Sequence, residues 1–134
     1  EMPFLFDNIW DLMVLADYLE TRSDVVDPKR IYSTGISLGG MHTLLWAFAD
    51  RRVAAGAPLI GTQGFRYAVE EDHWQGRVES IPDVFAKGAQ LLYDLPEPSG
   101  DAVDSLVVQA VWDAITPGIT SAFDADYLLA GIMP

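Results

Sequence analysis

The stretch Arg30-Ile31-Tyr32-Ser33-Thr34-Gly35-Ile36-Ser37-Leu38-Gly39-Gly40 decides the fold expected for this chain. Residues 30–34 are β-prone, and residues 41–49 have the composition of a helix. The sequence therefore predicts a strand that turns into a helix around Ser37. In so tight a turn, side chains at Gly35 and Gly39 would collide, and we expect both positions to require glycine. Gly40 is expected to let the helix pack close to the sheet.

The same stretch contains the pattern G-x-S-x-G with Ser37 at its centre. Between a strand and a helix, this pattern is typical of a nucleophile elbow, in which the serine has strained backbone geometry. The free N–H groups and the positive dipole end of the helix then face the reacting centre. The backbone N–H of Leu38 is the expected donor to an oxyanion formed during acyl transfer.

Composition excludes several other classes of function. Half of the 134 residues are hydrophobic, which is enough for a core, and the net charge of −12 argues against nucleic acid or an anionic membrane as a partner. No apolar run reaches the length of a membrane span. The chain has no cysteine and two histidines, which leaves little for a metal cluster and does not select a cellular compartment.

The first half of the chain predicts an α/β unit. An amphipathic helix is expected over residues 9–21, capped by Asp7 or Asn8. Its apolar face comprises Ile9, Leu12, Met13, Ala16 and Leu19. Residues 53–60 are apolar throughout, as in a parallel strand buried on both faces. Helix, strand, helix and strand together predict a crossover unit of an α/β sheet.

The second half contains no clear strand. Helices are expected over 65–79, from Pro82 onward, over 101–115, and from an Asp124 cap to Leu129. We therefore expect one incomplete domain over residues 1–134, with a core at 1–61 and a mainly helical excursion at 62–134.

Several segments together resemble α/β-hydrolases. They are Trp10-Asp11-Leu12-Met13, Asp17-Tyr18-Leu19, Asp27-Pro28-Lys29-Arg30-Ile31, Thr34 to His42, Ala57-Pro58-Leu59-Ile60-Gly61, Val111-Trp112-Asp113 and Ile115-Thr116-Pro117-Gly118. The chain is most similar to the group of acetyl xylan esterases, dienelactone hydrolases and prolyl-oligopeptidase-like (S9) enzymes. The resemblance spans nearly the whole chain, and its specific part is residues 10–61.

The resemblance implies a partial α/β-hydrolase fold and a serine hydrolase that cleaves carboxylic esters of small molecules through an acyl-enzyme, without metal or organic cofactor. In this family the order is Ser, acid, His, and the chain stops at Ile132-Met133-Pro134, where the acid-bearing strand would begin. The resemblance therefore implies an internal fragment to which only Ser37 and Leu38 carry over. On its own, such a chain is expected to be nearly inactive.

Two other functions stay open. The elbow does not distinguish ester from peptide bonds, so a prolyl-oligopeptidase-like peptidase is the first alternative. The second is a non-catalytic fragment or pseudo-hydrolase that binds without turnover. The sequence does not give the oligomeric state.

Other candidate residues are weaker. His73 could act as a base, but its neighbouring acids lie on the same segment, whereas an orienting carboxylate usually comes from another element. His42 follows Ser37 on the same helix and points about 140° away, as expected of a packed or hydrogen-bonded residue. The possible acids, expected to be mostly solvated, are Asp94, Asp104, Asp113, Asp124 and Asp126. The aromatic residues expected mainly in the excursion's own core, or else in a pocket wall, are Phe65, Tyr67, Trp74 and Phe85.

Overall fold

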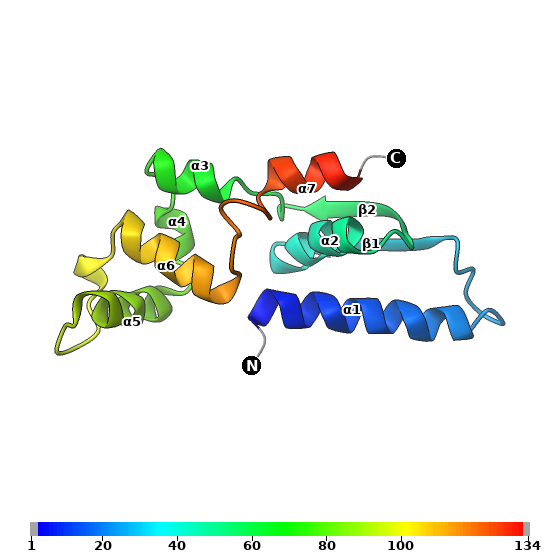
Figure 1. The fold of residues 1–134 in the computed structure, drawn as a ribbon, viewed down its shortest axis with the longest axis horizontal. Coiled ribbons are helices and arrows are strands. Elements are labelled where there is room, and N and C mark those ends of the chain that lie inside the picture. The colour runs from blue at the N-terminus through cyan, green and yellow to red at the C-terminus, as the bar shows by residue number, and fades with distance from the viewer. Residues whose placement is uncertain (1–2, 133–134) are drawn as a thin grey trace. The chain divides into compact units, whose positions relative to one another are not determined.

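A computed structural model describes residues 3–132 (Figure 1). The described chain is mixed α/β, with seven α-helices and one two-stranded parallel sheet. The terminal residues Glu1, Met2, Met133 and Pro134, which bear on the expectation of an internal fragment, lie outside the described residues.

The chain divides into two compact units. The first comprises the residues up to Gln63 together with those from Ala125 onward, and the second comprises Gly64–Asp124. The elbow lies in the first unit, and most of the expected helical excursion lies in the second.

The first unit contains α1 (Phe4–Thr21), β1 (Ile31–Ile36), α2 (Leu38–Ala49), β2 (Val53–Leu59) and α7 (Ala125–Ile132). β1 and β2 pair in parallel from Ile31↔Val53 to Ile36↔Leu59, with an irregularity after Ile31. α2 connects the two strands and packs against both, and α1 and α7 in turn pack against α2 (Figure 1). The predicted helix, strand, helix and strand are confirmed.

α1 begins earlier than the sequence predicts. Its N-cap is Pro3, and no side chain caps it, so the expected cap at Asp7 or Asn8 is wrong. The helix extends back by one turn because Leu5 continues the apolar face and is buried together with Ile9 and Ala16. Proline tolerates this position because its missing N–H has no helical partner there.

The expectation that residues 53–60 form a strand buried on both faces is wrong for the described residues. In β1, Ile31 is buried, Ser33 and Gly35 are half-buried, and Tyr32 and Ile36 are exposed. Most of β2 is exposed as well. The physical reason is that, among the described helices, α2 alone makes extensive contacts with the two strands.

The second unit contains α3 (Phe65–Glu70), α4 (Gln75–Val78), α5 (Pro82–Tyr93), a short 3-10 helix η1 (Gly100–Ala102) and α6 (Ser105–Ile115). The single helix expected over 65–79 is broken, because Asp72 adopts a left-handed φ of 56° between α3 and α4. Pro82 opens α5 as predicted. α6 begins later than predicted, at an N-cap formed by Asp104.

The core of the second unit lies between α5 and α6. Phe85, Ala89, Val107 and Val108 are buried there. A Cβ on Gly88 would lie 2.4 Å from a methyl carbon of Val111, so this glycine allows the two helices to approach closely.

The aromatic residues of the second unit divide between core and surface. Phe65 and Phe85 are buried, and the ring of Phe65 meets that of Trp112 edge-on with centroids 4.9 Å apart. Tyr67, in contrast, is exposed and stacks on His73. The core interpretation is therefore confirmed for Phe65 and Phe85 and is wrong for Tyr67.

Asp124 joins the two ends of the second unit. Its carboxylate accepts hydrogen bonds from the backbone N–H groups of Phe65 and Arg66, at 2.8 and 2.9 Å. It is also buried, so the expectation of a solvated carboxylate is wrong at this position. The carboxylate caps the first turn of α3, a contact that connects residues 59 positions apart in the sequence.

Candidate active site

Ser37 forms the turn between β1 and α2. Its backbone has φ 55° and ψ −113°, a combination that few residues other than glycine adopt. Such a conformation costs on the order of 1–3 kcal/mol and persists only where the surrounding structure enforces it. The strained geometry expected at this serine is therefore present.

Glycine is required at one side of the elbow and not at the other. A Cβ on Gly35 would lie 2.4 Å from the carbonyl carbon of Gly39, so a side chain here would force the backbone to shift. A Cβ on Gly39 would have nothing within 4 Å. The expected need for glycine is confirmed at Gly35. At Gly39 it is wrong within the described residues, because that Cβ would point into open space.

Two further glycines hold the start of α2 against the end of β2. A Cβ on Gly40 would lie 2.6 Å from the carbonyl oxygen of Leu59, and one on Gly61 would lie 2.2 Å from the carbonyl carbon of Gly40. The expected role of Gly40 in close packing is confirmed. The need for glycine at position 61 was not predicted, although a glycine directly after an apolar strand can indicate such a close approach.

Backbone hydrogen bonds fix the elbow on both sides. The N–H of Ser37 donates to the carbonyl of Leu59 at 2.9 Å, which continues the ladder between the strands. The N–H of Met41 donates to the carbonyl of Ser37 at 3.0 Å and begins the helical pattern of α2. The N–H groups of Leu38, Gly39 and Gly40 precede that first helical bond. They form the donor-rich, electropositive end of the helix.

His42 lies in contact with α1. Its Nε2 is 3.2 Å from the amide nitrogen of Asn8, and partial burial lowers the pKa of the imidazole. The expectation of a hydrogen-bonded helix residue is confirmed. A low pKa favours the neutral ring, which can accept a hydrogen bond from Asn8.

His73 belongs to the second unit. Its ring stacks on Tyr67 at a centroid distance of 5.5 Å, and its backbone N–H donates to Ala68 at 2.8 Å. These contacts fix the turn between α3 and α4, and none of them supplies a carboxylate partner for the ring.

The remaining acids occupy structural positions. Asp94 is the left-handed C-cap of α5, and Asp126 lies in the first turn of α7. Asp104 caps α6 by accepting from Leu106 and Val107, and it also accepts a hydrogen bond from the Tyr93 hydroxyl at 2.7 Å. That hydroxyl and the backbone N–H groups lower the pKa of Asp104. Asp113 lies within α6.

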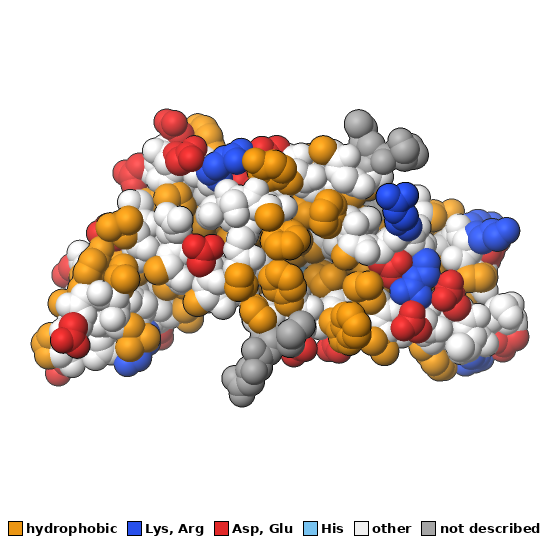
Figure 2. Space-filling view, in the orientation of Figure 1, with side chains coloured by type: hydrophobic (Ala, Val, Ile, Leu, Met, Phe, Trp, Pro, Cys, Tyr) orange, Lys and Arg blue, Asp and Glu red, His pale blue; other side chains and the backbone are white. Residues whose placement is uncertain are grey.

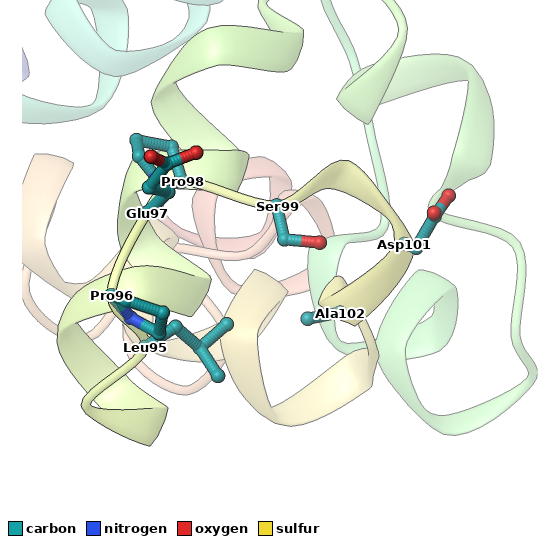
Figure 3. Close-up of a pocket in the computed structure, with 7 residues that line it drawn as sticks. All are labelled: Leu95, Pro96, Glu97, Pro98, Ser99, Asp101 and Ala102. Carbon is teal, nitrogen blue, oxygen red and sulfur yellow. The ribbon is translucent and has the colours of Figure 1, made fainter.

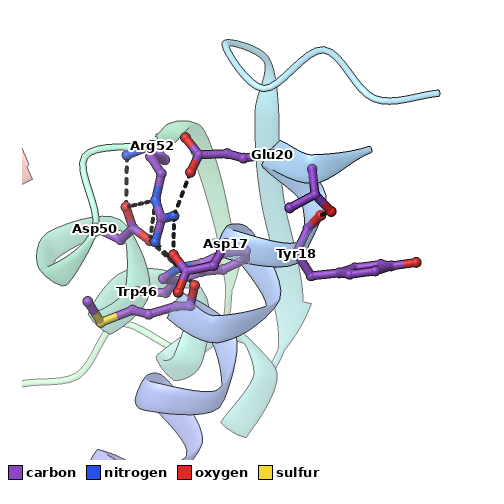
Figure 4. Close-up of polar contacts among 8 residues, drawn as sticks. Asp17, Tyr18, Glu20, Trp46, Asp50 and Arg52 are labelled. Atoms are coloured by element: carbon purple, nitrogen blue, oxygen red, sulfur yellow. Dashed lines mark hydrogen bonds and ion pairs between the residues drawn. The ribbon is translucent and has the colours of Figure 1, made fainter. Parts of the chain in front are cut away.

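The densest polar cluster lies away from the elbow (Figure 4). The Arg52 guanidinium donates to Asp50 at 2.7 and 2.8 Å, to Asp17 at 2.5 Å and to Glu20 at 3.1 Å. Trp46 also donates to Asp50. The hydrogen bonds from Arg52 hold the pKa of Asp50 below its usual value. The cluster ties α1 to the start of β2, and its mutually paired charges indicate a structural role.

A surface depression lies on the loop that follows α5. It is lined by Leu95, Pro96, Glu97, Pro98, Ser99, Asp101 and Ala102 (Figure 3). These residues come from one segment of the second unit, and they include the carboxylates of Glu97 and Asp101 but no histidine. The depression does not form a second catalytic arrangement.

Neither a metal site nor a membrane span emerges from the structure. Over residues 3–132, no group of three or more His, Cys, Asp or Glu side chains could hold a metal ion. No helix in that range is both long and apolar enough to cross a bilayer. Asp and Glu side chains are scattered over the visible face rather than gathered in one patch (Figure 2).

No family model matches the chain, and no curated protein or solved structure matches it either. The geometry at Ser37 is therefore the main indication of function.

Proposed function

We propose that Ser37 is the nucleophile of a serine hydrolase that acts on carboxylic esters, within an α/β-hydrolase fold. The observation that carries the proposal is the backbone of Ser37, which has φ 55° between a parallel strand and a helix N-terminus. Strain of this kind concentrates at functional sites. In a nucleophile elbow it presents the serine hydroxyl above the carboxyl end of the sheet.

The chemistry follows from the groups at the turn. The Ser37 hydroxyl attacks the ester carbonyl while a general base takes its proton, and the alcohol then leaves with a proton. Water hydrolyses the acyl-enzyme, which releases the carboxylic acid and restores the serine. The Leu38 N–H lies at the start of α2, where it can stabilise the oxyanion of each tetrahedral intermediate. The proposal requires no metal or organic cofactor.

The proposal assigns the role of base to neither histidine. His42 is engaged with Asn8, and the ring of His73 stacks on Tyr67. Without a positioned base, a serine hydroxyl is a weak nucleophile. The purified 134-residue chain is therefore expected to show only the small rate that binding and oxyanion stabilisation leave. An assay with p-nitrophenyl acetate measures this rate, and turnover equal to that of an ordinary esterase would identify His73 as the base to investigate.

The experiment that tests the proposal is Ser37→Ala in the protein as it is naturally expressed. Loss of the nucleophile should lower kcat on an aryl ester by at least about 10³-fold, because the triad groups act as a unit. It should also abolish labelling by a serine-directed fluorophosphonate. Ser23→Ala is the matched control, because Ser23 is an exposed serine in the loop after α1. Unchanged labelling of the Ser37→Ala variant would refute the assignment.

The same assay separates the alternatives. Hydrolysis of short prolyl peptides in preference to esters would indicate a peptidase. Failure of the wild-type protein to react with either substrate or with the phosphonate would indicate a non-catalytic protein.

A further inference from the structure

Ile60 has the second unusual backbone conformation of the first unit. It follows directly after β2 and has φ 47°. Two of the other described residues with left-handed φ, apart from glycine, are Asp72 and Asp94, a residue type that tolerates this region. Ile60 is β-branched, and for such a residue a positive φ is a clear outlier.

Ile60 and Ser37 lie next to each other at the carboxyl end of the sheet. Ile36 pairs with Leu59, and the N–H of Ser37 donates to the carbonyl of Leu59 at 2.9 Å. Continuing the register by one residue places Ile60 opposite Ser37. Adjacent strands are about 4.8 Å apart, so the two strained residues are direct neighbours.

The reason for the strain at Ile60 is the residue that follows it. Gly61 is buried against the first turn of α2, so close that a Cβ on it would lie 2.2 Å from the carbonyl carbon of Gly40. To reach that position directly after the strand, the chain takes a left-handed step at Ile60. The step leaves the Ile60 side chain 78% exposed beside the elbow.

A left-handed step of this kind suits glycine or asparagine better than isoleucine. Isoleucine at this position adds backbone strain and also exposes a large apolar side chain to water. Neither cost brings a packing gain in the first unit, because the side chain is mostly exposed. The packing of Gly61 explains the left-handed backbone but not the choice of isoleucine, and a strained residue whose side chain brings no packing gain points to a functional use of that side chain.

We propose that Ile60 is a specificity-determining residue that contacts the alkyl part of the substrate's acyl group. This inference rests on the proposed function of Ser37. In the bound ester, the carbonyl carbon lies at the Ser37 hydroxyl and the carbonyl oxygen points toward the Leu38 N–H. The alcohol group and the acyl chain of the ester then extend in different directions over the edge of the sheet. The alcohol side has to face the proton donor that releases it. The apolar surface of Ile60 suits the alkyl chain on the other side.

The test compares p-nitrophenyl acetate with p-nitrophenyl hexanoate, which have the same leaving group. In the full protein, Ile60→Ala and Ile60→Asn should lower kcat/KM for the hexanoate by about tenfold, since losing apolar contact with a few methylene groups has an effect of this size. For the acetate, kcat/KM should fall less, because acetate has almost no alkyl chain to bury, so the expected result is a lower ratio of hexanoate to acetate kcat/KM.

Two features make the result interpretable. Asparagine tolerates the left-handed region, so Ile60→Asn should be at least as stable as wild type, and a loss of hexanoate turnover would not reflect unfolding. Val25→Ala is the matched control, because Val25 is an exposed β-branched residue in the loop before β1, at the opposite end of the sheet.

The possible outcomes separate this inference from the proposed function. An unchanged hexanoate-to-acetate ratio in both Ile60 variants, with Ser37→Ala inactive, would overturn the role of Ile60 and leave the nucleophile in place. A wild-type protein without ester turnover would overturn both. A lower ratio in both variants and an unchanged ratio in Val25→Ala would support the role of Ile60.

Discussion

At the scale of single residues, the elbow depends on one glycine more than on the other. Gly35 lies so close to the backbone of Gly39 that a Cβ would stand 2.4 Å from its carbonyl carbon, whereas a Cβ on Gly39 would meet nothing within 4 Å. The pattern G-x-S-x-G treats the two positions alike. The structure separates them because only the Cβ direction of Gly35 points into the turn.

This asymmetry predicts opposite effects of two identical substitutions. Gly35→Ala should destabilise the chain by about 1–3 kcal/mol, as expected where an added methyl group forces the backbone to shift. Gly39→Ala lies in the first turn of α2 and should leave stability unchanged or raise it by up to about 1 kcal/mol, because alanine is the better helix former. Chemical denaturation followed by circular dichroism measures both. Equal destabilisation by the two variants would contradict this description of the turn.

The strained turn at Ser37 and the close packing at Gly35 and Gly40 were predictable from the sequence, because these features follow from the local chain direction at a strand-to-helix turn. It did not predict the left-handed φ of Ile60. That conformation depends on Gly61 reaching Gly40, a contact between residues 21 positions apart, as the closest atoms around Gly61 show. A local pattern contains no information of this kind.

At the scale of elements, Arg52 connects α1 with β2. Its guanidinium bonds Asp50, Asp17 and Glu20, and it also donates to the backbone carbonyl of Met13 at 3.1 Å (Figure 4). Asp50 is only 6% exposed, so its charge depends on this partner. The hydrogen bonds from Arg52 lower the pKa of Asp50 in the folded state.

Removing Arg52 should therefore destabilise the first unit strongly. Arg52→Ala leaves the Asp50 carboxylate buried without its cation, and we expect a loss of about 2–4 kcal/mol in the free energy of unfolding. Arg51→Ala is the matched control, because Arg51 is exposed, and it should change stability by less than about 0.5 kcal/mol. Urea denaturation of the two variants at neutral pH measures the difference. A similar small effect for both would mean that the cluster is a surface feature of little energetic value.

The ion pair of Asp50 and Arg52 also determines how the free energy of unfolding changes with pH. A carboxyl whose pKa is lowered by folding stabilises the protein fully above its unfolded pKa, and this contribution is lost as the pH falls through the folded pKa. Arg52→Ala should remove this acid-dependent part of the stability.

Which elements form was largely predictable, and where they end was less so. The periodicity of apolar residues gave α1, α2, β1 and β2, but Leu5 and Pro3 moved the start of α1. The break between α3 and α4 at Asp72 was not predicted, because one residue with a left-handed φ hardly changes the spacing of the apolar residues around it. The Arg52 cluster was missed for another reason, since its partners come from a helix more than 30 residues away.

At the scale of the whole molecule, the exposed apolar strands govern behaviour in solution. Tyr32, Ile36 and Leu59 are 65%, 67% and 49% exposed. In the described chain, the sheet has two strands, so each strand has one edge without a strand partner. Such edges readily pair with other chains. The net charge of −12 opposes this pairing through repulsion between chains.

The purified chain should therefore self-associate more as salt is added. Raising the ionic strength from about 0.01 M to about 0.15 M shortens the range of electrostatic repulsion from about 30 Å to about 8 Å. Size-exclusion chromatography with light scattering at the two salt concentrations measures the mass of the species present. A strictly monomeric chain with a cooperative unfolding transition at both concentrations would contradict this expectation and indicate a self-sufficient domain.

The division into two units was only partly visible in the sequence. The change from alternating strands and helices to helices alone indicated a boundary near residue 61. Nothing in the sequence indicated that α7 packs on α2, because this contact joins distant parts of the chain.

The hydrogen bonds from Phe65 and Arg66 to Asp124 hold together the two points at which the chain enters and leaves the second unit. The chain enters this unit at Gly64 and leaves it at Asp124, and one carboxylate holds the two points within hydrogen-bonding distance. A segment whose ends meet in this way can be exchanged for a shorter loop without separating the strands and helices that flank it. Residues 64–124 should therefore be replaceable by a short loop while the strands, helices and elbow of the first unit keep their connections.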